Sequence, residues 1–112
     1  MVGIDVVDIE RLRAVMARSP GASQRLFTAS ERAYCAARSD PVVHFAGTLA
    51  AKEAVIKALG LGPLPVWARR IEVVRDAGVP RVEVTGADAS GVNISISHDA
   101  GVAVAVAVRI SA

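Results

Sequence analysis

The sequence predicts an α+β fold, a single small domain over residues 1–112 in which an antiparallel sheet packs against a long central helix. Helix caps and helical spacing of apolar residues dominate the first half of the chain. Short runs that alternate apolar and polar residues, separated by turn sequences, dominate the second half. No repeat or linker divides the chain, and its length suits one domain with a modest core.

Composition narrows the class of protein. The chain is 53% hydrophobic and 21% charged, which is typical of a globular protein rather than a disordered one. Aromatic residues make up only 4%, so the core must be built from Val, Ile, Leu and Ala, and such a core favours added stability from self-association. The net charge of +2 fits an anionic ligand or an acidic partner, but it is too small to indicate nucleic-acid binding.

Three features predict a cytoplasmic protein that neither enters nor crosses a membrane. Cys35 is the only cysteine, which suits a reducing compartment and excludes an internal disulfide. Asp5 and Asp8 interrupt the first apolar run, so no secretory signal is expected. The apolar run over residues 102–108 is far too short to span a bilayer.

The chain opens with a β-branched run over residues 2–7, which predicts a strand. Strand side chains alternate, so Gly3 and Asp5 are expected on the same face. Asp8 then suits the N-cap of a helix over residues 9–18.

One face of that helix carries charge. Arg11, Val15 and Arg18 share it at the i, i+4, i+7 spacing. Two arginines around a valine either dock an acidic helix or form an ordinary solvated basic face, and helix periodicity does not decide between them.

Two further helices are marked by their caps. Residues 28–31 match the capping-box pattern, which predicts a helix that runs to about residue 38. Asp40 and Pro41 suit the N-cap and first position of the long central helix, and Gly60 suits the left-handed residue beyond its last turn.

The long helix combines an apolar stripe with charges at its margin. The stripe consists of Phe45, Leu49, Ile56 and Leu59. Lys52 falls in the middle of it, and Glu53 and Lys57 lie beside it four residues apart. Two interpretations stay open: a surface ion pair with a lysine whose ammonium reaches past the apolar stripe to solvent, or a site for a metal and an anion.

The second half is predicted to be mostly strand. Residues 60–65 contain two prolines and two glycines and are expected to form a rigid, non-helical connector. A hairpin with a turn at residues 76–80 follows, and a second turn at residues 98–101 joins the last two strands. The strands are expected at residues 70–75, 81–85, 92–97 and 102–110.

Three segments hold polar residues that packing alone does not explain, namely Asp5, the Lys52–Glu53–Lys57 group, and Ser97 with His98. Two carboxylates from separate elements suit Mg²⁺, which takes one or two protein carboxylates and completes its shell with water and phosphate oxygens. Lysines beside such a metal would stabilise phosphate charge, and a histidine at a strand end suits a phosphate oxygen. No Walker loop or dinucleotide-binding glycine motif is present.

The ordered set of motifs resembles one family, the holo-acyl-carrier-protein synthases, which are small 4′-phosphopantetheinyl transferases. The matching segments are Gly3-Ile-Asp5 with Asp8 and Arg11, Leu26-Phe-Thr-x-x-Glu31, the Phe45–Gly60 block with its Ala-Lys-Glu-Ala-x-x-Lys-Ala core, Gly78-x-Pro80 and Ser95-Ile-Ser-His98. The likeness covers nearly the whole chain. It implies the 4′-phosphopantetheinyl transferase fold and transfer of phosphopantetheine from coenzyme A to a serine of an apo acyl carrier protein, with release of adenosine 3′,5′-bisphosphate.

The resemblance also implies residue roles. Asp5 and Glu53 would ligate magnesium, and Glu53 or a metal-bound water would help to deprotonate the attacking serine. Lys57 would stabilise the pyrophosphate and the departing phosphate. Coenzyme A contacts would come from Ser97, His98, Gly78 and Pro80, with Lys52 either a further contact or a structural support.

Partners follow from the same resemblance. Arg11 and Arg18, with Val15 between them, would face the acidic carrier protein. The family's small members are homotrimers with each active site at a subunit interface, which agrees with the modest core expected here. The resemblance leaves open whether the client carrier protein serves fatty-acid, polyketide or peptide synthesis.

Departures from the family pattern lie close to the expected coenzyme site. Thr48 stands where many members carry an arginine, Val79 replaces a common lysine, and Asp99 follows His98 where threonine is more common. Candidates to replace the lost positive charge are Arg25, Arg69, Arg70 and Arg81.

Two other functions compete with the enzyme. The first is a catalytically silent module of the same fold that holds coenzyme A or a carrier protein, and the second is a trimerising structural domain with incidental polar residues. Retention of Asp5, Glu53 and Lys57 argues against the silent module, because an inactive relative should lose these residues first. The structural domain is distinguished by magnesium, since it should bind coenzyme A no better with the metal than without it.

Overall fold

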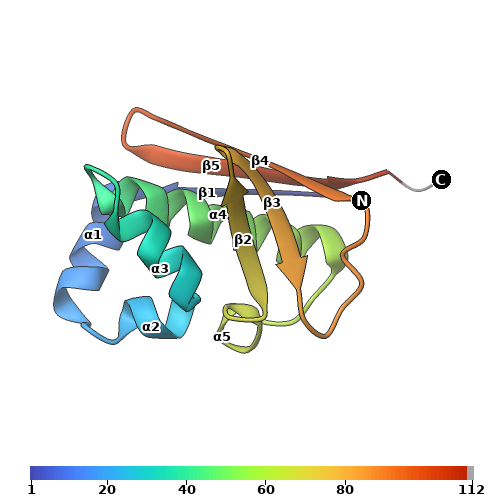
Figure 1. Cartoon of the computed structure of the whole chain (residues 1–112), viewed down its shortest axis with the longest axis horizontal. Coiled ribbons are helices and arrows are strands. Elements are labelled where there is room, and N and C mark those ends of the chain that lie inside the picture. Colours follow the sequence, from blue (N-terminus) through green and yellow to red (C-terminus); the bar gives the residue numbers. More distant parts are fainter. Residues whose placement is uncertain (111–112) are drawn as a thin grey trace.

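Helix α4 is the centre of the computed structural model, which describes residues 1–110 (Figure 1). It contacts the sheet strands β1, β5 and β4 on one side and α1, α3, α5 and β2 around the rest of its surface. In chain order the elements are β1 (Val2–Asp8), α1 (Ile9–Arg18), α2 (Ala22–Leu26), α3 (Ala29–Ala36), α4 (Pro41–Leu59), α5 (Leu64–Trp67), β2 (Ile71–Asp76), β3 (Val79–Val84), β4 (Val92–Asp99) and β5 (Val102–Arg109).

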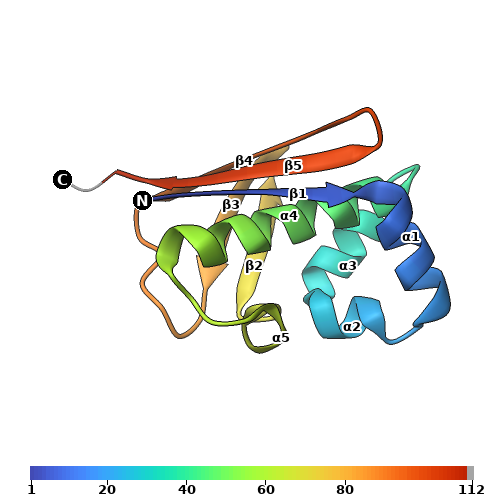
Figure 2. The same cartoon turned by 180° about the vertical axis from the view of Figure 1, so that it is seen from behind.

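The strands form two antiparallel sheets. The larger has the order β1-β5-β4, and the smaller is the β2-β3 hairpin. Both views show β1, β4 and β5 stacked along one side of α4, with α2 and α5 at the opposite side of the molecule (Figures 1 and 2). The predicted α+β class and the antiparallel sheet on a long helix are therefore confirmed.

The burial of α4 differs from the predicted single stripe. The helix is buried on nearly every face, and its most enclosed residues are small ones, including Ala46, Ala50, Ala51 and Ala54. A helix that is apolar all round is typical of a core element surrounded by others. Phe45 is buried as predicted, but Leu49, Ile56 and Leu59 are only half-buried.

Small residues let the sheet approach this helix closely. Ala103, Ala105 and Ala107 line the inner face of β5 and are almost fully buried. On β1, a Cβ atom added at Gly3 would lie 2.0 Å from the Ala54 carbonyl oxygen, far inside contact distance. Glycine is thus required where β1 crosses α4, and this crossing sets the position of Asp5 two residues further along the same strand face.

The predicted caps are found with one exception. Asp8 accepts a hydrogen bond from the Arg11 amide, the Thr28–Glu31 capping box is complete, and Gly60 has the left-handed conformation with φ 64°. Asp40 occupies the N-cap position of α4, yet its carboxylate binds the Arg13 guanidinium at 3.1 Å instead of capping the helix.

Two short helices were not predicted. Helix α2 lies between the two predicted helices at residues 9–18 and 28–38, where no helix was expected, and α5 begins inside the predicted non-helical connector at Leu64. Proline is compatible with the first turn of a helix, where its missing N–H is not needed, so Pro65 does not break α5. Within residues 1–110 no helix is both long and apolar enough to cross a lipid bilayer.

Candidate active site

Three of the predicted site residues meet between β1 and α4. The Lys57 ammonium lies 3.1 Å from the Asp5 carboxylate and donates to the Ile4 carbonyl at 2.9 Å. The Asp5 side chain is 18% exposed and that of Lys57 is 52% exposed, so the contact lies at the protein surface. The surface-pair interpretation required Lys57 to pair with Glu53, one turn earlier on the same helix. The Lys57 ammonium instead contacts Asp5 and Ile4 of β1.

Glu53 completes this acidic site. Its carboxyl is half-buried, and burial is the largest cause that raises its pKa above the ordinary glutamate value. The negative charge of Asp5 raises the pKa further, whereas Lys57 lowers it. A carboxyl group with a raised pKa next to a second carboxylate is typical of two kinds of site. One binds a cation, and the other uses the carboxylate to accept a proton.

The donor set fits a hard divalent cation. Asp5 and Glu53 would supply two carboxylate ligands from separate elements, which is the usual protein contribution to a magnesium site. Across residues 1–110 no group of three His, Cys, Asp or Glu side chains gathers closely enough to enclose a metal. Two carboxylates leave most of an octahedral coordination shell to water or to substrate oxygens.

The structure places Lys52 in the protein core and not at the surface site, which favours the structural support over the coenzyme contact among its two predicted roles. The Lys52 side chain is fully buried, and its ammonium lies 2.6 Å from the Glu31 carboxylate, which is buried as well. The ammonium also donates to the Ala68 carbonyl and lies 5.6 Å from the centre of the Phe27 ring. Burial lowers the pKa of Lys52, while Glu31 raises it.

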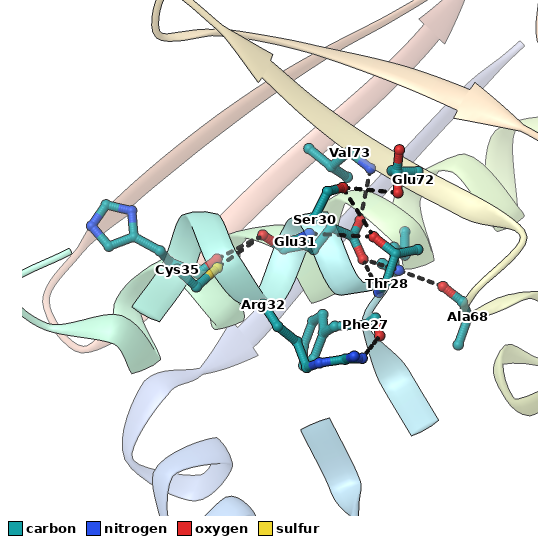
Figure 3. Close-up of polar contacts among 12 residues, drawn as sticks. Phe27, Thr28, Ser30, Glu31, Arg32, Cys35, Ala68, Glu72 and Val73 are labelled. Carbon is teal, nitrogen blue, oxygen red and sulfur yellow. Dashed lines mark hydrogen bonds and ion pairs between the residues drawn. The ribbon is translucent and has the colours of Figure 1, made fainter. Parts of the chain in front are cut away.

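Glu31 is the centre of a network that ties four elements together (Figure 3). Its two oxygens accept from the Thr28 amide at 2.8 Å and from the Val73 amide at 2.7 Å, in addition to Lys52. The carboxylate thus caps α3, anchors β2 and fixes the Lys52 position on α4, and Ala68 next to α5 completes the network. The sequence revealed Glu31 only as a helix cap, because Lys52 is 21 residues and Val73 is 42 residues away along the chain.

Ser97 and His98 lie on opposite faces of β4. Ser97 is exposed on the outer face of the sheet, opposite Val104. The ring of His98 points toward α4, where its centre lies 6.3 Å from that of His44. A single chain therefore does not present Ser97 and Asp5 to the same side of the sheet, since Asp5 faces α4.

A cationic cluster surrounds Tyr34 next to His98. The guanidinium carbons of Arg38 and Arg75 lie 4.5 and 4.7 Å from the centre of the Tyr34 ring, and His44 packs against its edge. The pKa of His44 is lowered mainly by burial, and then by the positive charges of Arg75, His98 and Arg38. Such a group of positive side chains favours an anionic ligand.

Arg75 occupies the neighbourhood of Thr48. Its guanidinium donates to the Thr48 hydroxyl at 2.8 Å, and that hydroxyl donates to the His44 carbonyl. Sequence reasoning did not name Arg75, the arginine that the structure places at Thr48. Of the four arginines named instead, Arg25, Arg69 and Arg70 lie around α2 and α5, while Arg81 is held by Asp76 and Glu83 on the hairpin.

The remaining predicted residues lie on exposed surfaces. Gly78 has φ 83° in the two-residue turn between β2 and β3, and Pro80 follows within β3, opposite Arg75. On α1, Arg11 and Arg18 are exposed and Val15 is half-buried. Arg11 and Val15 line an open apolar hollow of about 320 Å³ with Val6, Val7, Asp8, Leu12, Leu26 and Leu49.

Comparison with known proteins defines the class. The model of the 4′-phosphopantetheinyl transferase superfamily matches residues 1–107. A holo-[acyl-carrier-protein] synthase of Chlorobaculum parvum is 46% identical over 111 residues, covering 95% of this chain and 94% of its own. The crystal structure of the Neisseria meningitidis synthase matches with a TM-score of 0.83 at 28% identity, over 95% of this chain and 94% of that one. The Helicobacter pylori synthase, solved in complex with coenzyme A, matches with a TM-score of 0.77 at 29% identity, over 96% and 98%.

The chain therefore belongs to the 4′-phosphopantetheinyl transferase superfamily. Within it, the full-length match to curated synthases makes it an enzyme of the holo-acyl-carrier-protein synthase type.

Proposed function

We propose that this enzyme transfers the 4′-phosphopantetheine group of coenzyme A to a serine hydroxyl of an apo acyl carrier protein. The observation that carries the proposal is the meeting of Asp5, Glu53 and Lys57 at one surface site between β1 and α4. The match of the family model over residues 1–107 supports one transferase domain over the whole chain.

The site residues suit this chemistry. The serine oxygen would form a new bond to the phosphorus on the pantetheine side of the pyrophosphate, and the bond from that phosphorus to the bridging oxygen would break. The leaving group is adenosine 3′,5′-bisphosphate. Glu53 would accept the serine proton, directly or through water, and the Lys57 ammonium would stabilise charge on the departing phosphate. A magnesium ion bound by Asp5 and Glu53 would supply charge neutralisation at the pyrophosphate.

Coenzyme A contacts are proposed along the sheet end and the β2-β3 hairpin. His98 and Ser97 would bind phosphate oxygens, and Gly78 and Pro80 would border the adenine. This chain has Thr48 and Val79 where many family members have a positively charged residue. Arg75, which donates to the Thr48 hydroxyl, would supply positive charge in their place. The Arg38 and His44 side chains beside it add to the attraction for phosphate.

The outer face of the sheet supports a homotrimer with active sites between subunits. Val2, Ile4 and Val6 are each more than half exposed on β1, and they pair with Val108, Val106 and Val104 of β5. An apolar sheet face of this kind is typical of a protein interface. Ser97 lies on the same outer face, so it would reach a coenzyme bound at the Asp5 site of a neighbouring subunit.

We further propose a cytoplasmic enzyme that serves fatty-acid synthesis. The lone buried Cys35 and the absence of a disulfide among residues 1–110 suit a reducing compartment. The curated relatives are named for acyl carrier protein as their substrate.

Intact-protein mass spectrometry tests the proposal. An apo acyl carrier protein incubated with this enzyme, coenzyme A and Mg²⁺ should gain the mass of one phosphopantetheine, and EDTA should prevent the gain. Absence of transfer to several carrier proteins, with coenzyme A binding intact, would favour the catalytically silent module instead.

Arg11 tests the docking face of α1. Replacing Arg11 by alanine should raise the KM for apo carrier protein about two- to fivefold at low salt, because an exposed charge pair contributes about 0.2–1 kcal/mol. The KM for coenzyme A should stay unchanged, and the effect should shrink as salt screens the charge. Initial rates at 25 and 300 mM salt measure the KM values for carrier protein and for coenzyme A. A change mainly in the KM for coenzyme A would mean that Arg11 contacts the coenzyme and not the carrier protein.

A further inference from the structure

Helices α2 and α5 lie on the side of the molecule opposite the three-stranded sheet (Figures 1 and 2). Residues in and next to these helices line a basic groove. Two adjoining cavities of about 480 and 510 Å³ form it and share Arg25, Pro65 and Arg69. Arg70 and Val66 line one of them, and Leu26 and Gln24 line the other. The groove therefore combines guanidinium groups with apolar walls in an open surface channel.

The three arginines of this groove carry uncompensated charge. Three other arginines of the chain each lie within ion-pair distance of a carboxylate, namely Arg13, Arg81 and Arg109. Within residues 1–110, no carboxylate lies at ion-pair distance from Arg25, Arg69 or Arg70. Among the residues that the structure describes, those that line the two cavities include no Asp or Glu. Arg70 lies against the Trp67 ring, with its guanidinium carbon 5.5 Å from the ring centre. Trp67 lines neither cavity but lies behind Arg70, and arginine is among the residues enriched at binding hot spots.

The groove adjoins the proposed carrier-protein docking face. Leu26 lines both the groove and the apolar hollow that contains Arg11 and Val15. A partner seated on α1 and in the hollow would therefore meet Arg25 and Arg69 directly beyond Leu26. This continuity makes one extended surface of exposed arginines around half-buried apolar side chains, from Arg11 to Arg70.

Charge and shape select the occupant. The forked guanidinium group binds carboxylates with two parallel hydrogen bonds, and apolar walls suit the aliphatic side chains that alternate with acids on an amphipathic helix. A coenzyme phosphate is the weaker candidate, because α2 and α5 lie at the side of the molecule away from the sheet strands that carry Asp5 and His98.

We propose that the α2–α5 groove is a second docking site for the acyl carrier protein, in which Arg69 and Arg70 bind an acidic segment of the partner while α1 holds another. This inference rests on the proposed function, since it names a further contact of the same substrate protein. Recognition of the carrier would then be divided between two arginine sets joined at Leu26.

The test compares two double variants that remove equal charge. R69A/R70A removes arginines of the groove, and R81A/R109A removes arginines on β3 and β5 that this chain already pairs with its own carboxylates. For each protein, steady-state transfer gives kcat and the KM values for apo carrier protein and coenzyme A, and calorimetry gives the Kd for apo carrier protein without coenzyme A. R69K/R70K keeps the charge but loses the fork, and thermal melts establish that all variants fold.

The expected result is a rise of about five- to tenfold in the carrier-protein KM and Kd for R69A/R70A at low salt, with kcat and the coenzyme A KM close to wild type. R81A/R109A should leave carrier-protein binding within about twofold, and R69K/R70K should fall between wild type and R69A/R70A.

Three outcomes would overturn the inference. An active wild type with unchanged carrier binding in R69A/R70A would reject the second docking site while the proposed function stands. A rise confined to the coenzyme A KM would make the groove a phosphate site instead. Failure of the wild type to modify or bind any carrier protein would reject both the proposed function and this inference.

Discussion

Replacing Lys52 by methionine is expected to lower the free energy of unfolding by about 3–5 kcal/mol, because it leaves a buried carboxylate without its cation. Glu31 is enclosed in the core, and two backbone amides from Thr28 and Val73 would be its remaining partners. Methionine matches the volume of lysine, so the loss would come from charge and not from a cavity. Urea denaturation followed by circular dichroism measures the change.

A paired substitution separates the burial of an uncompensated charge from lost packing. In E31Q/K52M the charge is removed from both sides, and exchange of a buried ion pair for neutral groups is often nearly neutral. The glutamine carbonyl oxygen can replace only one of the two carboxylate oxygens that accept from the Thr28 and Val73 amides, so only part of the stability should return. Lys57→Met, on the same helix but half exposed, should change the free energy of unfolding by less than about 1 kcal/mol. A loss below about 1 kcal/mol for Lys52→Met would mean that Glu31 regains solvation or protonates at little cost.

The sequence predicted those helices and strands whose ends depend on residues close together in the chain. Thr28 with Glu31, Asp8, and Pro41 with Gly60 mark helix ends through bonds or dihedral angles that involve only near neighbours. The hairpins followed from alternation and from turn residues. The short helices α2 and α5 escaped because each has only one turn, and tertiary contacts outweigh propensity at that length.

The site was only partly predictable because its partners are distant in sequence. Lys52 looked like a charge at a helix margin, since helical spacing does not reveal that α3, α5 and β2 cover that face. The same limit hid Arg75, which reaches Thr48 from the hairpin. Asp40 was expected to cap α4 because position favours it, but Arg13 from α1 offered a charged partner. The magnesium ligands, the coenzyme contacts and the trimer stay predictions.

Glu53 carries the largest expected effect on activity. Replacing Glu53 by glutamine should lower kcat/KM for transfer by about 10²- to 10⁴-fold, because glutamine neither accepts the serine proton nor neutralises a cation. Glu72→Gln is the matched control, since Glu72 is a half-buried carboxylate whose recorded partner is the Ser30 hydroxyl. Wild-type turnover in the Glu53 variant would overturn the assignment of this site.

The same substitution should not weaken the fold, and its pH dependence has a definite sign. Burial and Asp5 raise the pKa of Glu53 in the folded protein, so folding holds its proton more tightly than the unfolded chain does. Above both pKa values the ionised carboxylate therefore costs stability, and Glu53→Gln should leave the melting temperature unchanged or slightly higher at pH 7. Any gain should fade as the pH falls below the unfolded-state pKa of about 4.3. Melts at pH 7 and pH 4, run beside the transfer assay, thus distinguish a catalytic carboxylate from a structural one: a variant that loses activity and stability together would indicate that Glu53 supports the fold.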